Sequence, residues 1–134
     1  MLVKHLDHLN LTVRDLAETI AFYGRLFDFE VVERGVYDGA PWAILRGGDA
    51  MLCCYEHASF ESVRPKIAHV HGVNHLSFRI ADRAAWEQRV RSEQPELLYG
   101  GVTRWPHSTS WYVADPSGYE IEVAAWDDDT VRFV

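Results

Sequence analysis

Two histidines, His8 and His75, begin similar segments that lie 67 positions apart in a chain of 134 residues. Residues 8–15 read His-Leu-Asn-Leu-Thr-Val-Arg-Asp, and residues 75–82 read His-Leu-Ser-Phe-Arg-Ile-Ala-Asp. Repetition of a structural unit explains matching apolar residues and aspartates, because these serve packing and helix capping. Repetition explains a matching histidine less readily, because a histidine at this position serves neither packing nor capping. The pair is therefore either two hydrogen-bonded histidines inherited from a duplication or two ligands of a metal.

An acidic pair near the end of the chain offers a third ligand. The strand expected after the turn at 115–118 carries Glu120 and Glu122 in alternation with apolar residues. If Ile121 and Val123 face a helical layer, the glutamates point to the opposite face of the sheet. Such a pair is ordinarily the solvated side of a strand. If this face lines a cleft with the histidines, two imidazoles and a carboxylate suit Fe(II), with Mn(II), Ni(II) and Zn(II) as alternatives.

The elements that must position these residues follow the same repeat. Each histidine begins a segment with the alternation of a half-buried strand, and each segment ends at an aspartate that can cap a helix. The helices are expected over 16–27, after Asp15, and over 83–91, after Asp82. Residues 57–70 have no clear period and are the expected connector. Six further strands are predicted at 30–36, 42–46, 50–55, 97–99, 110–114 and 119–125.

Each half therefore contains a strand, a helix and then three strands, which predicts an α+β fold. We expect one domain over residues 1–134, with the helices on one face of the sheet and the other face left to line a cleft. The length is sufficient for a hydrophobic core without disulfides or structural metals.

Composition narrows the function classes. A net charge of −7 disfavours a nucleic-acid partner and favours a small-molecule ligand. We expect no membrane association, because the chain lacks a run of about 18 apolar residues. The N-terminus also lacks the continuous apolar stretch of a signal peptide. Cys53 and Cys54 are adjacent and rarely form a disulfide in that arrangement, so a cytoplasmic location is expected.

Taken in order, these segments resemble the vicinal oxygen chelate superfamily. This superfamily includes glyoxalase I, extradiol ring-cleaving dioxygenases, fosfomycin-resistance enzymes and bleomycin-resistance proteins. The residues that carry the resemblance are 8–16, Phe22-Tyr23, 75–78 and 112–123.

The resemblance implies two tandem βαβββ modules, at 1–57 and 70–126, that form a cupped mixed sheet around a metal site. Carried over by position, the metal ligands are His8, His75 and Glu122. The family's acidic ligand lies four residues after the turn glycine, which selects Glu122 rather than Glu120.

Two further residues resemble catalytic positions of the family. Tyr112 stands ten residues before Glu122, as does a substrate-binding tyrosine of the extradiol dioxygenases, and fosfomycin-resistance enzymes also have a tyrosine there. His107 is the candidate acid/base, although it lies closer to Tyr112 than the dioxygenase spacing implies. A core aromatic residue and a loop histidine are the structural alternatives.

Arg104, Asn10 and Cys53 are the expected substrate-binding residues. Arg104 can pair with a carboxylate or phosphonate. Cys53 occupies the position where glyoxalase I has a fourth, carboxylate ligand, which disfavours glyoxalase activity in the strict sense. Its thiolate can bind a soft metal, or the residue can simply fill space in the core.

The resemblance implies that two substrate oxygens chelate a divalent metal. We expect an extradiol-type dioxygenase with Fe(II), acting on a small catecholic substrate. The enzyme alternatives are a fosfomycin-resistance-like thiol transferase and a glyoxalase-like lyase or isomerase. A metal-free, ligand-sequestering protein of the bleomycin-resistance kind is the non-enzyme alternative. We also expect a homodimer, with the site formed either within one chain or across the interface.

Overall fold

A computed structural model describes residues 2–57 and 72–132. Contacts within the chain divide it into two compact units, Met1–Ser62 and Val63–Val134, and each is described by itself. The prediction of a single domain over residues 1–134 therefore stays a prediction. The expected connector lies outside the described residues except for His57, as does the beginning of the second predicted module.

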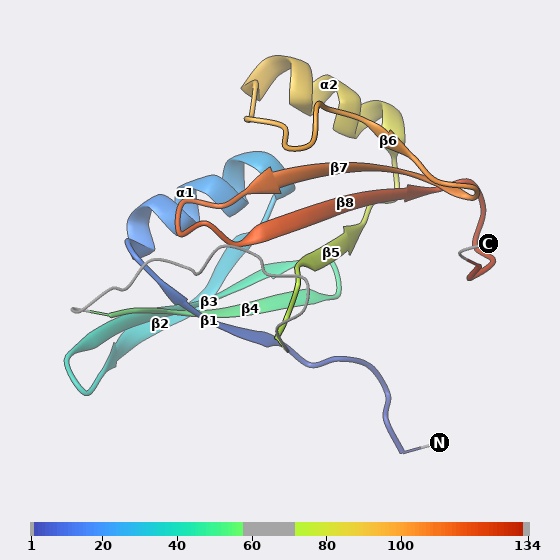
Figure 1. Ribbon diagram of the computed structural model, residues 1–134. Helices are drawn as coiled ribbons and strands as arrows, with labels where there is room; N and C mark the ends of the chain where they lie inside the picture. The colour runs from blue at the N-terminus through green and yellow to red at the C-terminus, as the bar shows by residue number, and fades with distance from the viewer. Residues whose placement is uncertain (1, 58–71, 133–134) are drawn as a thin grey trace. The chain divides into compact units, whose positions relative to one another are not determined.

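The first unit forms a four-stranded mixed sheet covered by one helix (Figure 1). Its strands follow the order β1-β4-β3-β2, with β1 parallel to β4 and the other pairs antiparallel. The elements are β1 (Leu9–Val13), α1 (Leu16–Phe27), β2 (Glu30–Tyr37), β3 (Ala40–Gly47) and β4 (Ala50–Glu56).

Helix α1 has the residues at 16–27 that the sequence predicts. The Asp15 side chain accepts a hydrogen bond from the Glu18 backbone N–H at 2.8 Å. This contact satisfies one of the amide groups that a helix N-terminus leaves without an intrahelical partner. Tyr23 and Leu26 bury the apolar side of the helix, which packs on β2, β3 and β4. The cap fixes where the helix begins, and the buried stripe fixes its orientation on the sheet.

Replacing Asp15 with Ala should lower the free energy of unfolding by about 1 kcal/mol, because an N-cap aspartate contributes about that much. Urea denaturation followed by circular dichroism measures the change. Asp82→Ala removes the equivalent cap of the second helix, where the carboxylate accepts from the Ala85 N–H at 3.0 Å. Glu33→Ala removes an exposed carboxylate and controls for the loss of charge. Equal effects of Asp15→Ala and Glu33→Ala would contradict the capping role.

The second unit repeats the topology of the first. Its sheet follows the order β5-β8-β7-β6, with β5 parallel to β8 and the other pairs antiparallel (Figure 1). The predicted α+β class and the two βαβββ repeats are therefore confirmed. The elements are β5 (Leu76–Arg79), α2 (Arg83–Glu93), β6 (Thr103–Arg104), β7 (Ser108–Ala114) and β8 (Glu120–Trp126).

One predicted strand of the second unit is wrong. Residues 97–99 make only an isolated bridge, Leu97 to Val113, and the strand in this part of the sheet is β6. The backbone turns into the left-handed region at Tyr99 (φ 56°), Gly100 (φ 78°) and Gly101 (φ 112°). Three successive positive φ values are incompatible with an extended strand.

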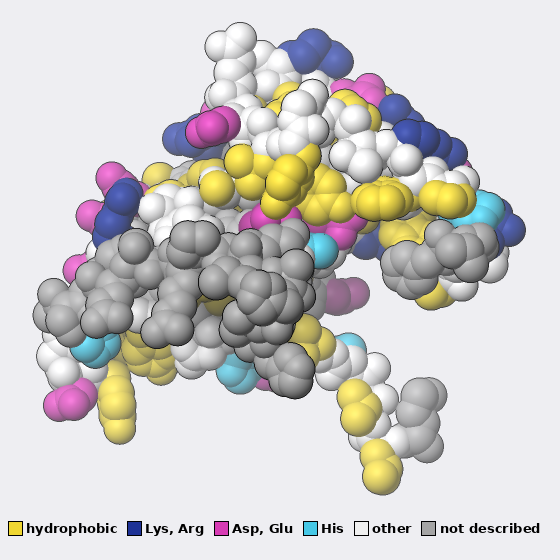
Figure 2. All heavy atoms as spheres, viewed as in Figure 1, with side chains coloured by type: hydrophobic (Ala, Val, Ile, Leu, Met, Phe, Trp, Pro, Cys, Tyr) yellow, Lys and Arg dark blue, Asp and Glu magenta, His cyan; other side chains and the backbone are white. Residues whose placement is uncertain are grey.

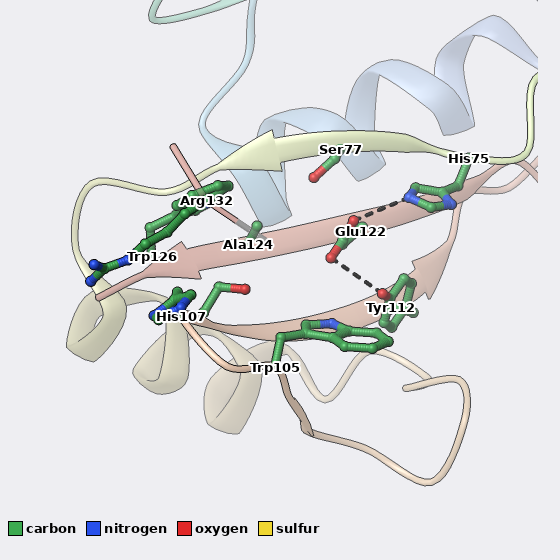
Figure 3. A pocket seen from close by; sticks show the side chains of 10 residues that line it. His75, Ser77, Trp105, His107, Tyr112, Glu122, Ala124, Trp126 and Arg132 are labelled. Carbon is green, nitrogen blue, oxygen red and sulfur yellow. Dashed lines mark hydrogen bonds and ion pairs between the residues drawn. The ribbon is translucent and has the colours of Figure 1, made fainter. Parts of the chain in front are cut away.

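Alternation along β7 and β8 separates a buried face from an open one. Trp111, Val113, Ile121 and Val123 are almost completely buried, and the Trp111 ring meets Trp86 of α2 edge to face at 6.2 Å. As predicted, Glu122 points to the opposite face, which α2 does not cover (Figure 3). In the described part of the chain, no helix is both long and apolar enough to cross a membrane.

Candidate functional site

A cavity of about 530 Å³ lies on the open face of the second unit's sheet (Figure 3). Strands β5, β7 and β8 contribute alternate residues to its floor, since residues two apart in a strand share a face. The turn between β6 and β7 and the segment after β8 supply its other walls. In the space-filling view, hydrophobic side chains form a row over β7 and β8 with carboxylates beside them (Figure 2).

His75 and Glu122 meet at one end of this cavity. The imidazole Nε2 lies 3.1 Å from Glu122 Oε2, while Nδ1 lies 2.7 Å from the Asn74 amide oxygen. Because that oxygen only accepts, the hydrogen bond assigns the proton of a neutral ring to Nδ1. Nε2 then presents a lone pair beside a carboxylate oxygen. A proton on Nε2 makes this contact a hydrogen bond to the carboxylate, and in its absence the imidazole nitrogen and the carboxylate oxygen have the chemistry to hold a divalent metal together.

The Glu122 carboxylate is held from its other side. Its Oε1 accepts hydrogen bonds from Ser110 Oγ at 2.6 Å and from the Tyr112 hydroxyl at 3.2 Å. Ser110 is fully buried and Tyr112 is 8% exposed. Burial raises the pKa of Tyr112 above its ordinary value; the negative charge of Glu122 raises it further, and the Trp105 indole acts in the opposite direction. The phenol therefore stays protonated and donates to Glu122, leaving Oε2 directed to His75.

The opposite end of the cavity contains His107, Arg132 and Trp126 (Figure 3). Arg132 donates to Asp128 Oδ2 at 2.9 Å, and the Arg79 guanidinium lies over the Trp126 ring at 4.9 Å. Arg79 does not line the cavity, but the Arg132 guanidinium and the hydroxyls of Ser77 and Ser108 do, and they can bind an anionic group. His107 thus lines the cavity, at the end away from His75 and Tyr112, and its role as an acid/base stays a prediction.

Arg104 does not line the cavity. Its guanidinium makes a bidentate pair with Asp127, Nη1–Oδ1 at 2.8 Å and Nη2–Oδ2 at 2.6 Å, and donates to Thr109 Oγ1 at 3.1 Å. These hydrogen bonds raise the pKa of Arg104 and lower that of Asp127. Substrate binding by Arg104 stays a prediction. Through these hydrogen bonds the Arg104 guanidinium connects β6 to Asp127, directly after β8, and so holds the turn that carries His107.

The other predicted site residues, His8, Asn10 and Cys53, belong to the first unit. His8 precedes β1, and its Nδ1 lies 2.7 Å from Asp7 Oδ2. Asn10 pairs with Cys53 across β1 and β4, as Ser77 pairs with Glu122 across β5 and β8. Cys53 therefore occupies in β4 the position that Glu122 occupies in β8, as the resemblance to glyoxalase I implies. Cys53 is a half-buried free thiol.

His8 belongs to the first unit and His75 and Glu122 to the second, so a site that joins the three stays a prediction. Within either unit, the described residues contain no group of three His, Cys, Asp or Glu side chains that could hold a metal. The second unit supplies two candidate ligands, and a further ligand has to come from elsewhere. His8 remains the predicted one.

Sequence reasoning missed Ser77, Ser108, Ser110 and Arg132 as residues around the site. The three serines could have been found from alternation, because Ser77 lies two residues after His75, and Ser110 and Ser108 lie two and four residues before Tyr112. Arg132 had no such signal, since it follows the last strand in a polar segment without a period.

The family assignment follows from a match over most of the chain. Residues 5–123 match the model of the Glyoxalase/Bleomycin resistance protein/Dioxygenase superfamily. The chain belongs to this superfamily. The match includes both histidine segments and the strand through Glu122, and the resemblance inferred from those motifs is confirmed.

Three known proteins show what the chain is similar to. The chain is 27% identical over 129 residues to glutathione transferase FosA of Serratia marcescens, covering 91% of this chain and 81% of that protein. Among solved structures, a glyoxylase/bleomycin resistance protein/dioxygenase domain from a Frankia species has a TM-score of 0.78 at 20% identity, over 96% of both chains. The fosfomycin resistance protein FosX of Listeria monocytogenes, complexed with Mn(II) and sulfate, has a TM-score of 0.69 at 20% identity, over 92% and 93%. The two structural likenesses describe the fold.

Proposed function

We propose that this protein is a divalent-metal-dependent enzyme of the fosfomycin-resistance type, which transfers a thiol to a small anionic substrate. The observation that carries the proposal is the His75–Glu122 pair at one end of a cavity that also contains Arg132, His107 and serine hydroxyls. The FosA relative, a glutathione transferase, supports this reaction over the extradiol-type dioxygenase that the sequence favoured. FosX, which has the same fold, was crystallised with Mn(II) and sulfate, and this supports a protein that takes both a divalent metal and an oxyanion.

In this proposal His8, His75 and Glu122 hold the metal, and a homodimer allows His8 to come from the same chain or from its partner. When bound, a divalent metal supplies Lewis-acid polarisation of a substrate oxygen. Ser110 and Tyr112 orient the Glu122 carboxylate for that task. Arg132 and the hydroxyls of Ser77 and Ser108 bind the anionic group of the substrate, which fixes its orientation in the cavity.

The distribution of charge along the cavity argues for an anionic substrate. A catechol needs two adjacent oxygens at the metal and an acid/base group next to them. His107 was the candidate for that group, yet it lies with Trp126 at the far end of the cavity. An oxyanion-bearing substrate uses both ends, since its reacting oxygen lies at His75 and Glu122 and its charge lies near Arg132 and His107.

The test is consumption of glutathione by the metal-loaded protein in the presence of fosfomycin. We expect turnover with Mn(II), its loss on chelation, and its return when Mn(II) is restored. Tyr112→Phe should fold, stay loaded at saturating Mn(II) and turn over about 10- to 100-fold more slowly, the usual effect of losing a residue that orients a ligand.

Other outcomes select the alternatives. Oxygen uptake with Fe(II) and a catechol, without thiol transfer, would support the dioxygenase reading. Failure to bind any divalent metal would support a ligand-sequestering protein. Collapse of the fold in Tyr112→Phe would make Tyr112 a core residue instead.

A further inference from the structure

The segment that replaces the predicted strand at 97–99 carries a tyrosine in an unfavourable backbone conformation. Tyr99 has φ 56°, in the left-handed region, where a bulky side chain is rarely found. Gly100 and Gly101 follow with positive φ values that cost glycine little. A backbone of this kind persists when surrounding contacts hold it, so the contacts of Tyr99 indicate what its conformation achieves.

Two contacts connect Tyr99 to the open face of the sheet. Its hydroxyl donates to Glu120 Oε2 at 2.6 Å, and its ring meets the Tyr112 ring edge to face, with centroids 5.3 Å apart. The backbone supports the same arrangement, since the Leu98 N–H donates to the Tyr112 carbonyl at 2.8 Å. Tyr99 itself is 62% exposed. Burial of its own ring therefore does not account for the strained conformation.

Tyr112 has two aromatic neighbours. The Tyr99 ring contacts it edge to face, and the His75 ring contacts it at 5.9 Å with an interplanar angle of 88°. A phenol ring held in this way cannot rotate about its first side-chain bond without losing one of the contacts. Its hydroxyl consequently stays on Glu122 Oε1.

Tyr99 also distinguishes the two acidic side chains of β8. Glu120 and Glu122 lie two residues apart on the same strand, and the sequence alone left both as candidate ligands before the family was considered. The Tyr99 hydroxyl engages Glu120, whereas Ser110, Tyr112 and His75 engage Glu122. The hydrogen bond from Tyr99 thereby keeps the Glu120 carboxylate apart from the proposed metal ligands His75 and Glu122.

We propose that Tyr99 is a positioning residue of the metal site. It fixes the Tyr112 ring and restrains Glu120, so that Glu122 alone is presented beside His75. This inference rests on the proposed function, because it concerns the same metal. Tyr99 itself is not among the residues that line the cavity. The strained backbone of Tyr99 is the cost of that placement.

Three variants separate positioning from a structural role. Tyr99→Gly removes the ring and relieves the backbone, Tyr99→Phe removes only the hydroxyl, and Val102→Ala changes another exposed apolar residue of the segment. We expect Tyr99→Gly to unfold near the wild-type temperature, because relief of the backbone offsets the lost ring contact. It should bind Mn(II) about threefold to tenfold more weakly, because Tyr112 no longer holds Glu122 in place; the strength of one edge-to-face pair limits the size of this effect. Tyr99→Phe should keep the ring contact and weaken Mn(II) binding less. Val102→Ala should match wild type in both measurements.

A second measurement does not depend on the metal. In metal-free protein with ¹³C-labelled tyrosine, the Tyr112 ring signals should shift or broaden in Tyr99→Gly and stay unchanged in Val102→Ala. Unchanged Tyr112 signals together with wild-type Mn(II) affinity would overturn the inference. A parallel fall in thermal stability and Mn(II) affinity would also overturn it, since that is the pattern of a structural residue. If wild type binds no Mn(II) but the Tyr112 signals change, the proposed function fails while the positioning of Tyr112 stands.

Discussion

Replacing Glu122 with Gln should weaken metal binding by at least about a hundredfold and leave the fold intact. The amide is neutral and presents an N–H₂ group or a weaker oxygen donor where the carboxylate lay beside His75 Nε2. Loss of a partner that merely orients a ligand costs about 10- to 100-fold in affinity, and a ligand itself should cost more. Ser110 and Tyr112 can still donate to the amide oxygen, so we expect little change in stability.

The measurement is an anaerobic titration of metal-stripped protein with Fe(II), Mn(II), Ni(II) and Zn(II). Glu120→Gln is the matched control, because it changes the same kind of side chain two residues away while leaving an oxygen that can accept from Tyr99. We expect the control to bind metal as wild type does. Equal weakening in both variants would indicate a general effect of charge on β8 and contradict the assignment of Glu122 as a ligand.

Replacing Trp86 with Ala should destabilise the second unit by about 3–5 kcal/mol, the usual cost of removing a large aromatic side chain from a core. Within the described residues, Trp86 is the buried side chain of α2, and its indole packs edge to face on Trp111 of β7. The rest of α2 is rich in charged residues. Burial of Trp86 therefore supplies most of the hydrophobic stabilisation that this helix contributes. Urea denaturation monitored by circular dichroism measures the loss.

Trp105→Ala serves as the control for that experiment, because Trp105 is 47% exposed. Its effect on stability should be clearly smaller than that of Trp86→Ala, because much less of the Trp105 side chain is buried. Similar losses in the two variants would mean that α2 is held by its polar contacts instead. The hydrogen bond from Arg83 to Thr109 is the first candidate for such a contact.

The sequence predicted best those elements whose signals are local. Asp15 and Asp82 cap the helices as expected, since the capping contact joins residues three apart. The alternation around Glu122 also predicted its face correctly, because that alternation is a property of a single strand. Residues 97–99 are apolar and for that reason were predicted to form a strand. The backbone is left-handed at 99–101, however, and this ends any extended conformation there. Apolar composition alone does not determine whether a segment has the extended backbone of a strand.

The arrangement of the site was harder to predict from the sequence, because it depends on contacts between residues that are distant in the chain. Nothing near Arg104 indicates that its guanidinium pairs with Asp127, 23 residues later. The position of His107 within the cavity depends on the same pair. The resemblance to the superfamily selected Glu122 over Glu120, a choice that local pattern left open. The set of His8 with His75 and Glu122 remains a prediction.

The parallel pairing of β5 with β8 has a consequence for folding. His75 and Glu122 are 47 residues apart in sequence, and α2, β6 and β7 all lie between them. Closing so long a loop is entropically unfavourable until the intervening elements provide contacts of their own. A nascent or partly unfolded chain thus has a histidine without its carboxylate. If the proposed metal site is right, the pair of His75 and Glu122 becomes available to a metal only after β8 has paired with β5, so metal binding follows the completion of this sheet.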